Sequence, residues 1–150
     1  MLKKILITVL VLVVLVVALG VSKTLSTPDH LYSQTGSFAG CPSRPSCVSS
    51  VAKDPAQQIR PLSYQGQVSV VVTQLRGLLE KMPGATAVSR QGNYIHAVFQ
   101  TPTMKYRDDL ELLVHADGRV DVRSISRFGY RDFGVNRDRI EALRQAFKNR

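Results

Sequence analysis

A polar stretch between Arg123 and Arg139 carries most of the side chains that could do chemistry. Its arginines can offer forked pairs of N–H donors to a carboxylate or a phosphate. Its serines fall on the core-facing side of a predicted strand, where hydroxyl groups need polar partners. An asparagine at the start of the next predicted helix adds free backbone amides and a dipole that favour anions. The stretch therefore predicts an anion-binding site composed of Ser124, Ser126, Arg127, Arg131, Asn136 and Arg137.

The same stretch also fits a purely structural interpretation. Asp108, Asp109 and Asp132 could pair with its arginines and form a polar network that fixes the loop to the sheet. A network and a ligand site do not exclude each other, so both interpretations stay open at this point. A ligand site would make the protein a binding or assembly module.

A small hydrolase-like enzyme is the alternative function, with Ser126, His96 or the Asp108 and Asp109 carboxylates as its reactive groups. His96 shares a predicted strand face with Tyr94, and the two side chains could form an acid–base pair. A strand histidine in such a position is more often a structural residue with its hydrogen bonds satisfied. Asp108 and Asp109 are neighbours along a strand, so they point to opposite faces and form no dyad. The sequence contains no Gly-x-Ser-x-Gly turn, phosphate loop or zinc-protease helix. We therefore expect a binding module rather than an enzyme and assign no catalytic residue.

The two cysteines of the chain, Cys41 and Cys47, are separated by five residues. In an exported protein such an even pair predicts a structural disulfide. Free or redox-active thiols are the alternative, although redox pairs usually have two intervening residues. A zinc site would need two more ligands, and His30, His96 and His115 show no ligand spacing. We therefore expect a disulfide, no metal and no other cofactor.

The N-terminus predicts export. Residues 5–21 are almost entirely apolar and follow Lys3 and Lys4. A helix of that length spans roughly 25 Å, the short limit for crossing a bilayer. The positive-inside rule then predicts a single-pass protein of the bacterial inner membrane, with a cytoplasmic N-terminus and a periplasmic domain. The alternative is a signal peptide, cleaved to secrete the domain, because Ala18 and Gly20 form a small-x-small cleavage pattern.

Composition and charge limit the number of domains and the classes of partner that the protein can have. The hydrophobic share of 44% is inflated by the anchor or signal segment of residues 1–21. A polar tether of residues 22–40 and a domain of residues 41–150 remain, enough for one core and too little for several domains. The net charge of +9 is concentrated in residues 119–150, with nine basic and four acidic residues. Export argues against nucleic acid, so we expect the membrane, an anionic lipid headgroup, an envelope polymer or another envelope protein as partners.

Hydrophobic periodicity predicts the scaffold that positions these groups. Apolar side chains at helical spacing predict one helix at residues 67–82 and another at residues 136–148, which Asn136 can cap. Alternating patterns between the helices predict four strands, at residues 85–90, 94–101, 108–115 and 120–127. This order predicts an α+β fold: a four-stranded antiparallel meander sheet with N- and C-terminal helices packed on one face, preceded by one N-terminal transmembrane helix.

The last two predicted strands form the clearest hairpin, around Asp117 and Gly118. A two-residue loop would mix aliphatic and charged side chains on each face. We therefore predict a three-residue loop at residues 117–119, which pairs Val114 with Val122 and gathers the aliphatic side chains on one face. The opposite face, which carries the charged side chains, is expected to be partly solvated.

Several motifs occur in an order that resembles one known family, the domain of unknown function 1499 family. The resemblance covers roughly residues 41–147 and rests on the Cys-Pro-x3-Ser-Cys-Val-Ser-Ser start and on the polar run after Val122. It implies a small domain of bacteria and plastids, often behind a membrane anchor or export signal. It implies no established activity, so no catalytic role is carried over. The matching positions are Cys41, Cys47, Tyr94, His96, Asp108, Asp109, Arg123, Ser124, Ser126, Arg127, Gly129, Asp132, Gly134, Asn136 and Arg137.

Overall fold

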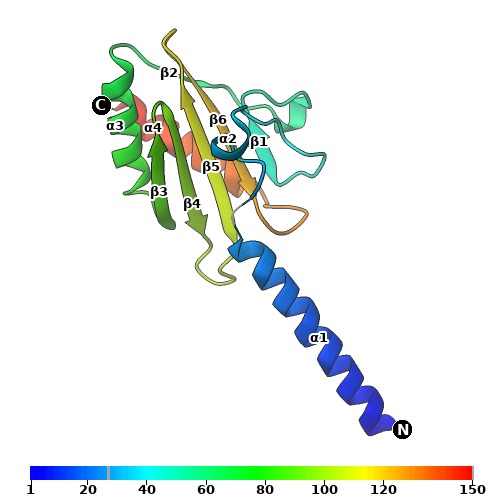
Figure 1. Ribbon diagram of the computed structural model, residues 1–150. Helices are drawn as coiled ribbons and strands as arrows, with labels where there is room; N and C mark the ends of the chain where they lie inside the picture. The colour runs from blue at the N-terminus through cyan, green and yellow to red at the C-terminus, as the bar shows by residue number, and fades with distance from the viewer. Residues whose placement is uncertain (27, 150) are drawn as a thin grey trace.

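The fold is an antiparallel sheet with two helices packed on one face (Figure 1), and the computed structural model describes residues 1–26 and 28–149. The elements follow in the order α1 (Leu2–Leu25), α2 (Tyr32–Thr35), β1 (Cys47–Ser49), a 3-10 turn (Pro55–Gln57), β2 (Leu62–Ser63), α3 (Val68–Leu79), β3 (Ala85–Gln91), β4 (Tyr94–Gln100), β5 (Arg107–Val114), β6 (Arg119–Ser126) and α4 (Val135–Lys148).

The predicted meander is confirmed, but the sheet is larger than expected. Within the described residues it has six strands rather than four, in the order β1-β6-β5-β4-β3, with β2 also paired to β6. β1 and β2 share the edge of β6 that the meander leaves open. They are three and two residues long, which is too short for an alternating pattern to be recognised in the sequence.

The hydrophobic core lies between this sheet and the two long helices, as predicted. The apolar side chains of α3 recur at helical spacing and place Val72, Leu75 and Leu79 against the sheet. α4 adds Ile140 and Leu143. The strands supply the alternate residues Ile95, Ala97, Phe99, Leu110, Leu112, Val114, Val120 and Val122.

The β5–β6 hairpin has the predicted loop length but a different register. Val114 pairs with Val120 rather than with Val122, and His115 and Arg119 flank the turn through a 2.8 Å backbone hydrogen bond. The loop therefore comprises residues 116–118. The reason is Gly118, whose φ of 86° is left-handed and suits the last position of a three-residue hairpin loop. Since the shift is two residues, each side chain keeps its predicted face.

Along β5 and β6 the second face of the sheet is buried, which corrects the expectation that it is partly solvated. Asp109 and Glu111 are completely inaccessible to solvent, and Asp121 and Arg123 nearly so. The segment before β1 covers part of this face: the backbone amide of Tyr32 donates to Glu111 over 2.8 Å. Residues 22–40, expected to form a polar tether, thus contribute α2 and the fully buried Leu31 to the folded body.

α1 projects away from the end of the sheet (Figure 1). Its window Leu2–Leu19 is long and apolar enough to cross a membrane, and none of that window is buried within the protein. The N-terminal apolar helix is therefore present as predicted, and it could serve as a membrane anchor or a signal sequence.

Candidate functional site

The predicted site residues Ser124, Ser126 and Asn136 meet in a buried network between β6 and the first turn of α4. Ser124 Oγ donates to Asn136 Oδ1 over 2.6 Å. The Asn136 amide nitrogen donates to Ser126 Oγ over 3.0 Å and to the Ser46 carbonyl over 3.1 Å. All four residues are buried, so these polar groups satisfy one another away from solvent.

Arg139 completes this network and was not among the predicted residues. Its guanidinium donates to Asn136 Oδ1 over 2.6 Å and to Asp108 Oδ2 over 2.7 Å, and it lies 4.6 Å above the Phe99 ring. The sequence signal that could have identified Arg139 is its position three residues after Asn136, on the same helix face. The ion pair between Arg139 and Asp108 therefore holds the serines and the asparagine in place.

α4 begins differently from the prediction. Gly134 rather than Asn136 occupies the N-cap position, and the Asp132 carboxylate accepts from the Gly134 amide over 3.1 Å and from the Asn136 amide over 3.0 Å. An aspartate can satisfy the first amides of a helix in this way. Asn136 is consequently free to turn its side chain into the network rather than toward its own backbone.

Arg127 lies on the other face of the sheet, in a buried cluster with Asp109 and His96. Its guanidinium makes two 2.8 Å hydrogen bonds to Asp109, and His96 Nε2 lies 2.7 Å from Asp109 Oδ1. Burial by itself would raise the pKa of Asp109, but hydrogen bonds from His96 and Arg127 and the charge of Arg127 outweigh it and lower that pKa. The cluster therefore holds Asp109 as a carboxylate.

A second ion pair, which the sequence did not indicate as a contact, lies beside this cluster. Arg123 donates to Glu111 over 2.5 Å, and both side chains are almost inaccessible to solvent. Tyr94 donates its hydroxyl to the other oxygen of Glu111 over 2.9 Å. Burial, followed by the charge of Glu111 and this hydrogen bond, raises the pKa of Tyr94, so the phenol stays protonated.

The sheet separates the groups that an enzyme would have to combine. Ser126 lies opposite Asp108 and faces the helices, whereas His96 lies opposite Glu111 and faces away from them. Ser126 bonds to Asn136, and His96 bonds to Asp109. Ser126 and His96 therefore do not form a nucleophile–base pair. Asp108 and Asp109 also point to opposite faces of the sheet, as predicted.

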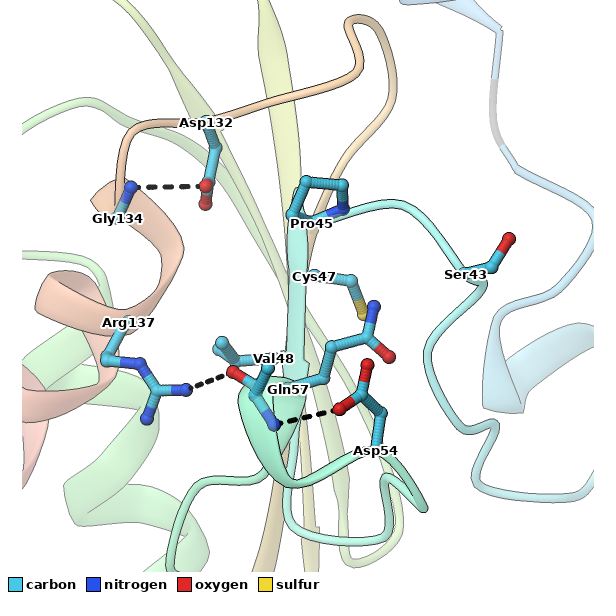
Figure 2. A pocket seen from close by; sticks show the side chains of 10 residues that line it. Ser43, Pro45, Cys47, Val48, Asp54, Gln57, Asp132, Gly134 and Arg137 are labelled. Carbon is cyan, nitrogen blue, oxygen red and sulfur yellow. Dashed lines mark hydrogen bonds between the residues drawn. The ribbon is translucent and has the colours of Figure 1, made fainter.

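The three predicted arginines do not converge. Arg131 is exposed on the loop after β6. Arg137 donates to the Ala56 carbonyl over 2.9 Å and lines a cavity of about 220 Å³ at the start of α4, shown in Figure 2. Asp54 and Asp132 also line this cavity. Two acidic groups beside one arginine make it unsuited to an anion.

A larger concave surface lies between the chain around β2 and the outer side of α4, and we call it the basic groove. Its volume is about 640 Å³. Four cationic side chains and only one acidic side chain, Glu141, line it. The cationic lining consists of Arg60, Arg137, Arg144 and Lys148.

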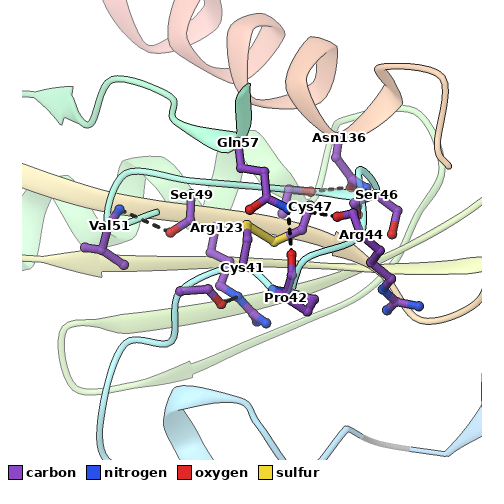
Figure 3. The surroundings of a disulfide bond; sticks show 12 residues. Cys41, Pro42, Arg44, Ser46, Cys47, Ser49, Val51, Gln57, Arg123 and Asn136 are labelled. Atoms are coloured by element: carbon purple, nitrogen blue, oxygen red, sulfur yellow. Dashed lines mark hydrogen bonds between the residues drawn. A yellow bond between two sulfur atoms is a disulfide. The ribbon is translucent and has the colours of Figure 1, made fainter. Parts of the chain in front are cut away.

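Cys41 and Cys47 form the predicted disulfide, with sulfurs 2.07 Å apart (Figure 3). The enclosed loop is fixed from inside by Gln57, whose amide donates to the Pro42 carbonyl over 2.6 Å and to the Arg44 carbonyl over 2.8 Å. The bond suggests a domain outside the reducing cytoplasm. Across the residues that the structure describes, no group of three histidine, cysteine or acidic side chains could hold a metal ion.

A six-stranded α+β domain, closed by a disulfide and carried behind an apolar N-terminal helix, is the class of protein that these features define. The chain belongs to the family described as protein of unknown function DUF1499, whose model matches residues 37–147. No curated protein and no solved structure matches this chain.

Proposed function

We propose that this protein is a membrane-anchored binding module of the bacterial envelope that holds the phosphate groups of an anionic polymer in the basic groove. In this proposal α1 stays in the inner membrane, the N-terminus is cytoplasmic and the domain lies in the periplasm. The groove takes over the role first assigned to the loop after β6, and Arg137 is the residue that both assignments share. The observation that carries the proposal is the excess of cationic over acidic side chains in this groove.

Hydrogen bonds from Arg144 hold one wall of the basic groove in place. Arg144 donates to the carbonyls of Pro61 and Arg60 over 2.8 Å and 2.5 Å and to Glu141 over 3.0 Å. These bonds fasten the segment before β2 to α4. A ligand would therefore meet a preformed surface, which lowers the entropic cost of binding.

The remaining cations provide the attraction. Arg60 and Lys148 are exposed, and Arg137 is partly exposed at the groove wall. Each exposed contact to a phosphate is worth about 0.5 kcal/mol. Three contacts then contribute about 1.5 kcal/mol, which is roughly tenfold in affinity. Contacts this weak favour a polymer, whose repeated charges raise the effective concentration of each next phosphate.

The position of the groove suits a partner that lies away from the membrane. Figure 1 shows the C-terminal end of α4 at the opposite end of the domain from α1. Arg144, Gln145 and Lys148 come from this end of α4. An anchored domain would therefore present the groove to the envelope rather than to its own bilayer.

The test is binding of fluorescent polyphosphate to the full chain in nanodiscs of neutral phosphatidylcholine, measured by anisotropy. The triple variant Arg60→Gln, Arg137→Gln, Lys148→Gln should lose about tenfold in affinity. The matched control Lys53→Gln, Lys81→Gln, Arg90→Gln removes the same charge from exposed positions outside the groove and should lose less than about twofold. Equal losses in the two variants would contradict the proposal, because they would show attraction by net charge alone.

A further inference from the structure

We propose that two loops at the end of the sheet next to α1 form a surface that inserts into the headgroup region of a bilayer with anionic lipids. We call this the loop surface: residues 101–106, between β4 and β5, and residues 127–134, between β6 and α4. The inference rests on α1 remaining in the membrane, as in the proposed function, but not on the basic groove.

Exposed apolar side chains mark the loop surface. Outside α1, the large hydrophobic side chains exposed among the described residues number seven, and five belong to the loop surface or to the residue that follows it. Phe133 is 92% exposed and Tyr130 68% exposed. Such a gathering is unusual for a water-facing surface and marks an interaction site. The five are Met104, Phe128, Tyr130, Phe133 and Val135.

The two loops lie side by side. β4 ends and β5 begins at the same end of the sheet, where Gln100 pairs with Arg107. The Arg127 amide donates to the Arg107 carbonyl over 2.9 Å, and the Tyr106 and Phe128 rings are 5.3 Å apart between centroids. The exposed side chains therefore belong to one continuous surface.

A direct contact places the loop surface next to the anchor. Arg127 Nη1 donates over 2.8 Å to the carbonyl of Ser26, the C-cap residue directly after α1. Figure 1 shows α1 leaving from this end of the sheet. The candidate span ends at Leu19, and the six further helical residues up to Leu25 rise about 9 Å. Ser26 and its neighbouring loops would then lie near the headgroup layer.

The chemistry of the loop surface matches that layer. Tyrosine and other aromatic side chains concentrate at membrane interfaces, where the ring meets the acyl boundary and a polar tip meets water. Lys105 and Arg131 are exposed among these aromatic groups and would attract anionic headgroups. The second loop also holds one acidic side chain, Asp132, which accepts from the amides of α4, and the exposed cations Lys105 and Arg131 outnumber it.

The backbone holds the tips of both loops in an uncommon conformation. Lys105 and Phe133 each have a φ of 55°, and they are the two non-glycine residues with positive φ in the described part of the chain. A bulky aromatic residue rarely adopts this conformation unless its surroundings impose it. The Asp132 bonds on the following residues impose it here and keep the Phe133 ring in solvent.

The absence of tryptophan from the chain permits a direct test. Phe133→Trp introduces a single tryptophan on the loop surface, and Val70→Trp introduces one at a half-exposed position on α3. Each full-length variant is placed in nanodiscs with phosphatidylglycerol, made with and without bromine-labelled acyl chains that quench tryptophan. Phe133→Trp should lose about half of its fluorescence to brominated lipid, while Val70→Trp should lose almost none.

Three further outcomes bear on the inference. Adding Lys105→Gln and Arg131→Gln to Phe133→Trp should reduce quenching in phosphatidylglycerol nanodiscs but not in neutral ones. If Phe133→Trp is quenched no more than Val70→Trp, the loop surface is not inserted and the inference is overturned. If quenching is the same with and without phosphatidylglycerol, the assigned preference for anionic lipid is overturned. Loss of polyphosphate binding by the groove variant would leave all these results unchanged.

Discussion

Replacement of Arg123 by methionine tests whether the buried ion pair governs the stability of the second sheet face. Methionine retains most of the aliphatic volume but removes the cation that faces Glu111. The carboxylate would keep its hydrogen bonds from Tyr94 and Tyr32 without a counter-charge. Breaking a buried pair by removing one partner costs about 3–5 kcal/mol, and Glu111 is completely inaccessible to solvent. We therefore expect Arg123→Met to lower the free energy of unfolding by about 4 kcal/mol.

A second substitution separates charge from packing. In Arg123→Met with Glu111→Gln, the glutamine oxygen can still accept from Tyr94 and Tyr32, and no isolated charge is left. The remaining cost is that of an imperfectly paired amide, about 1–3 kcal/mol. The double variant should therefore be about 2 kcal/mol more stable than Arg123→Met alone, although it carries one more change.

The assay is urea unfolding of the full chain in detergent micelles, followed by near-ultraviolet circular dichroism of the tyrosines. Arg76→Met is the control, because its ion pair with Glu80 is about half-exposed and should cost only about 0.5 kcal/mol. A loss below about 1 kcal/mol for Arg123→Met would refute the unpaired-charge reasoning. Failure of Glu111→Gln to restore stability would also refute it, because the loss would then come from packing.

Two further predictions concern the other polar clusters. Because the pKa of Asp109 is lowered in the folded protein, its contribution to stability is present above the ordinary value of 3.8 and lost as pH falls from there through the lowered pKa. Asp109→Asn should therefore flatten the acid side of a plot of urea midpoint against pH, and an unchanged slope would contradict this. Asn136→Ala should cost about 3 kcal/mol in the urea assay, since it unpairs buried groups of Ser46, Ser124 and Ser126. Gln145→Ala, at an exposed position of the same helix, should cost less than about 0.5 kcal/mol, and equal costs would show that the network is not stabilising.

The elements with strong local patterns could be predicted from the sequence. Residues 67–82 and 136–148 carry enough apolar repeats to define a helix face, and they correspond to α3 and α4. The meander strands alternate for six or more residues, which fixes their faces. The predicted hairpin register was wrong by two residues because the loop was placed at residues 117–119. Its last position is left-handed and is occupied by Gly118, since glycine adopts that conformation readily.

The candidate site depended on contacts that no local pattern encodes. Asp109 and Glu111 alternate with leucines and therefore look like the solvated side of a strand. Their burial follows from a segment about 80 residues earlier in the chain, where a single tyrosine amide reaches Glu111. The structure likewise divides Arg127 and Arg137 between opposite sides of the sheet, although spacing alone suggested a common site.

The contacts of Leu31 and Tyr32 decide where this domain can be cut from its anchor. A soluble fragment that starts at Cys41, or at residue 37 where the family match begins, would lack the buried Leu31 side chain and the Tyr32 amide that binds Glu111. Its exposed second face would present unpaired polar groups and an apolar hollow to solvent, a surface prone to aggregation. A fragment that begins at Pro28 retains both residues, so Pro28 is the starting point suited to expression of the domain without the apolar helix.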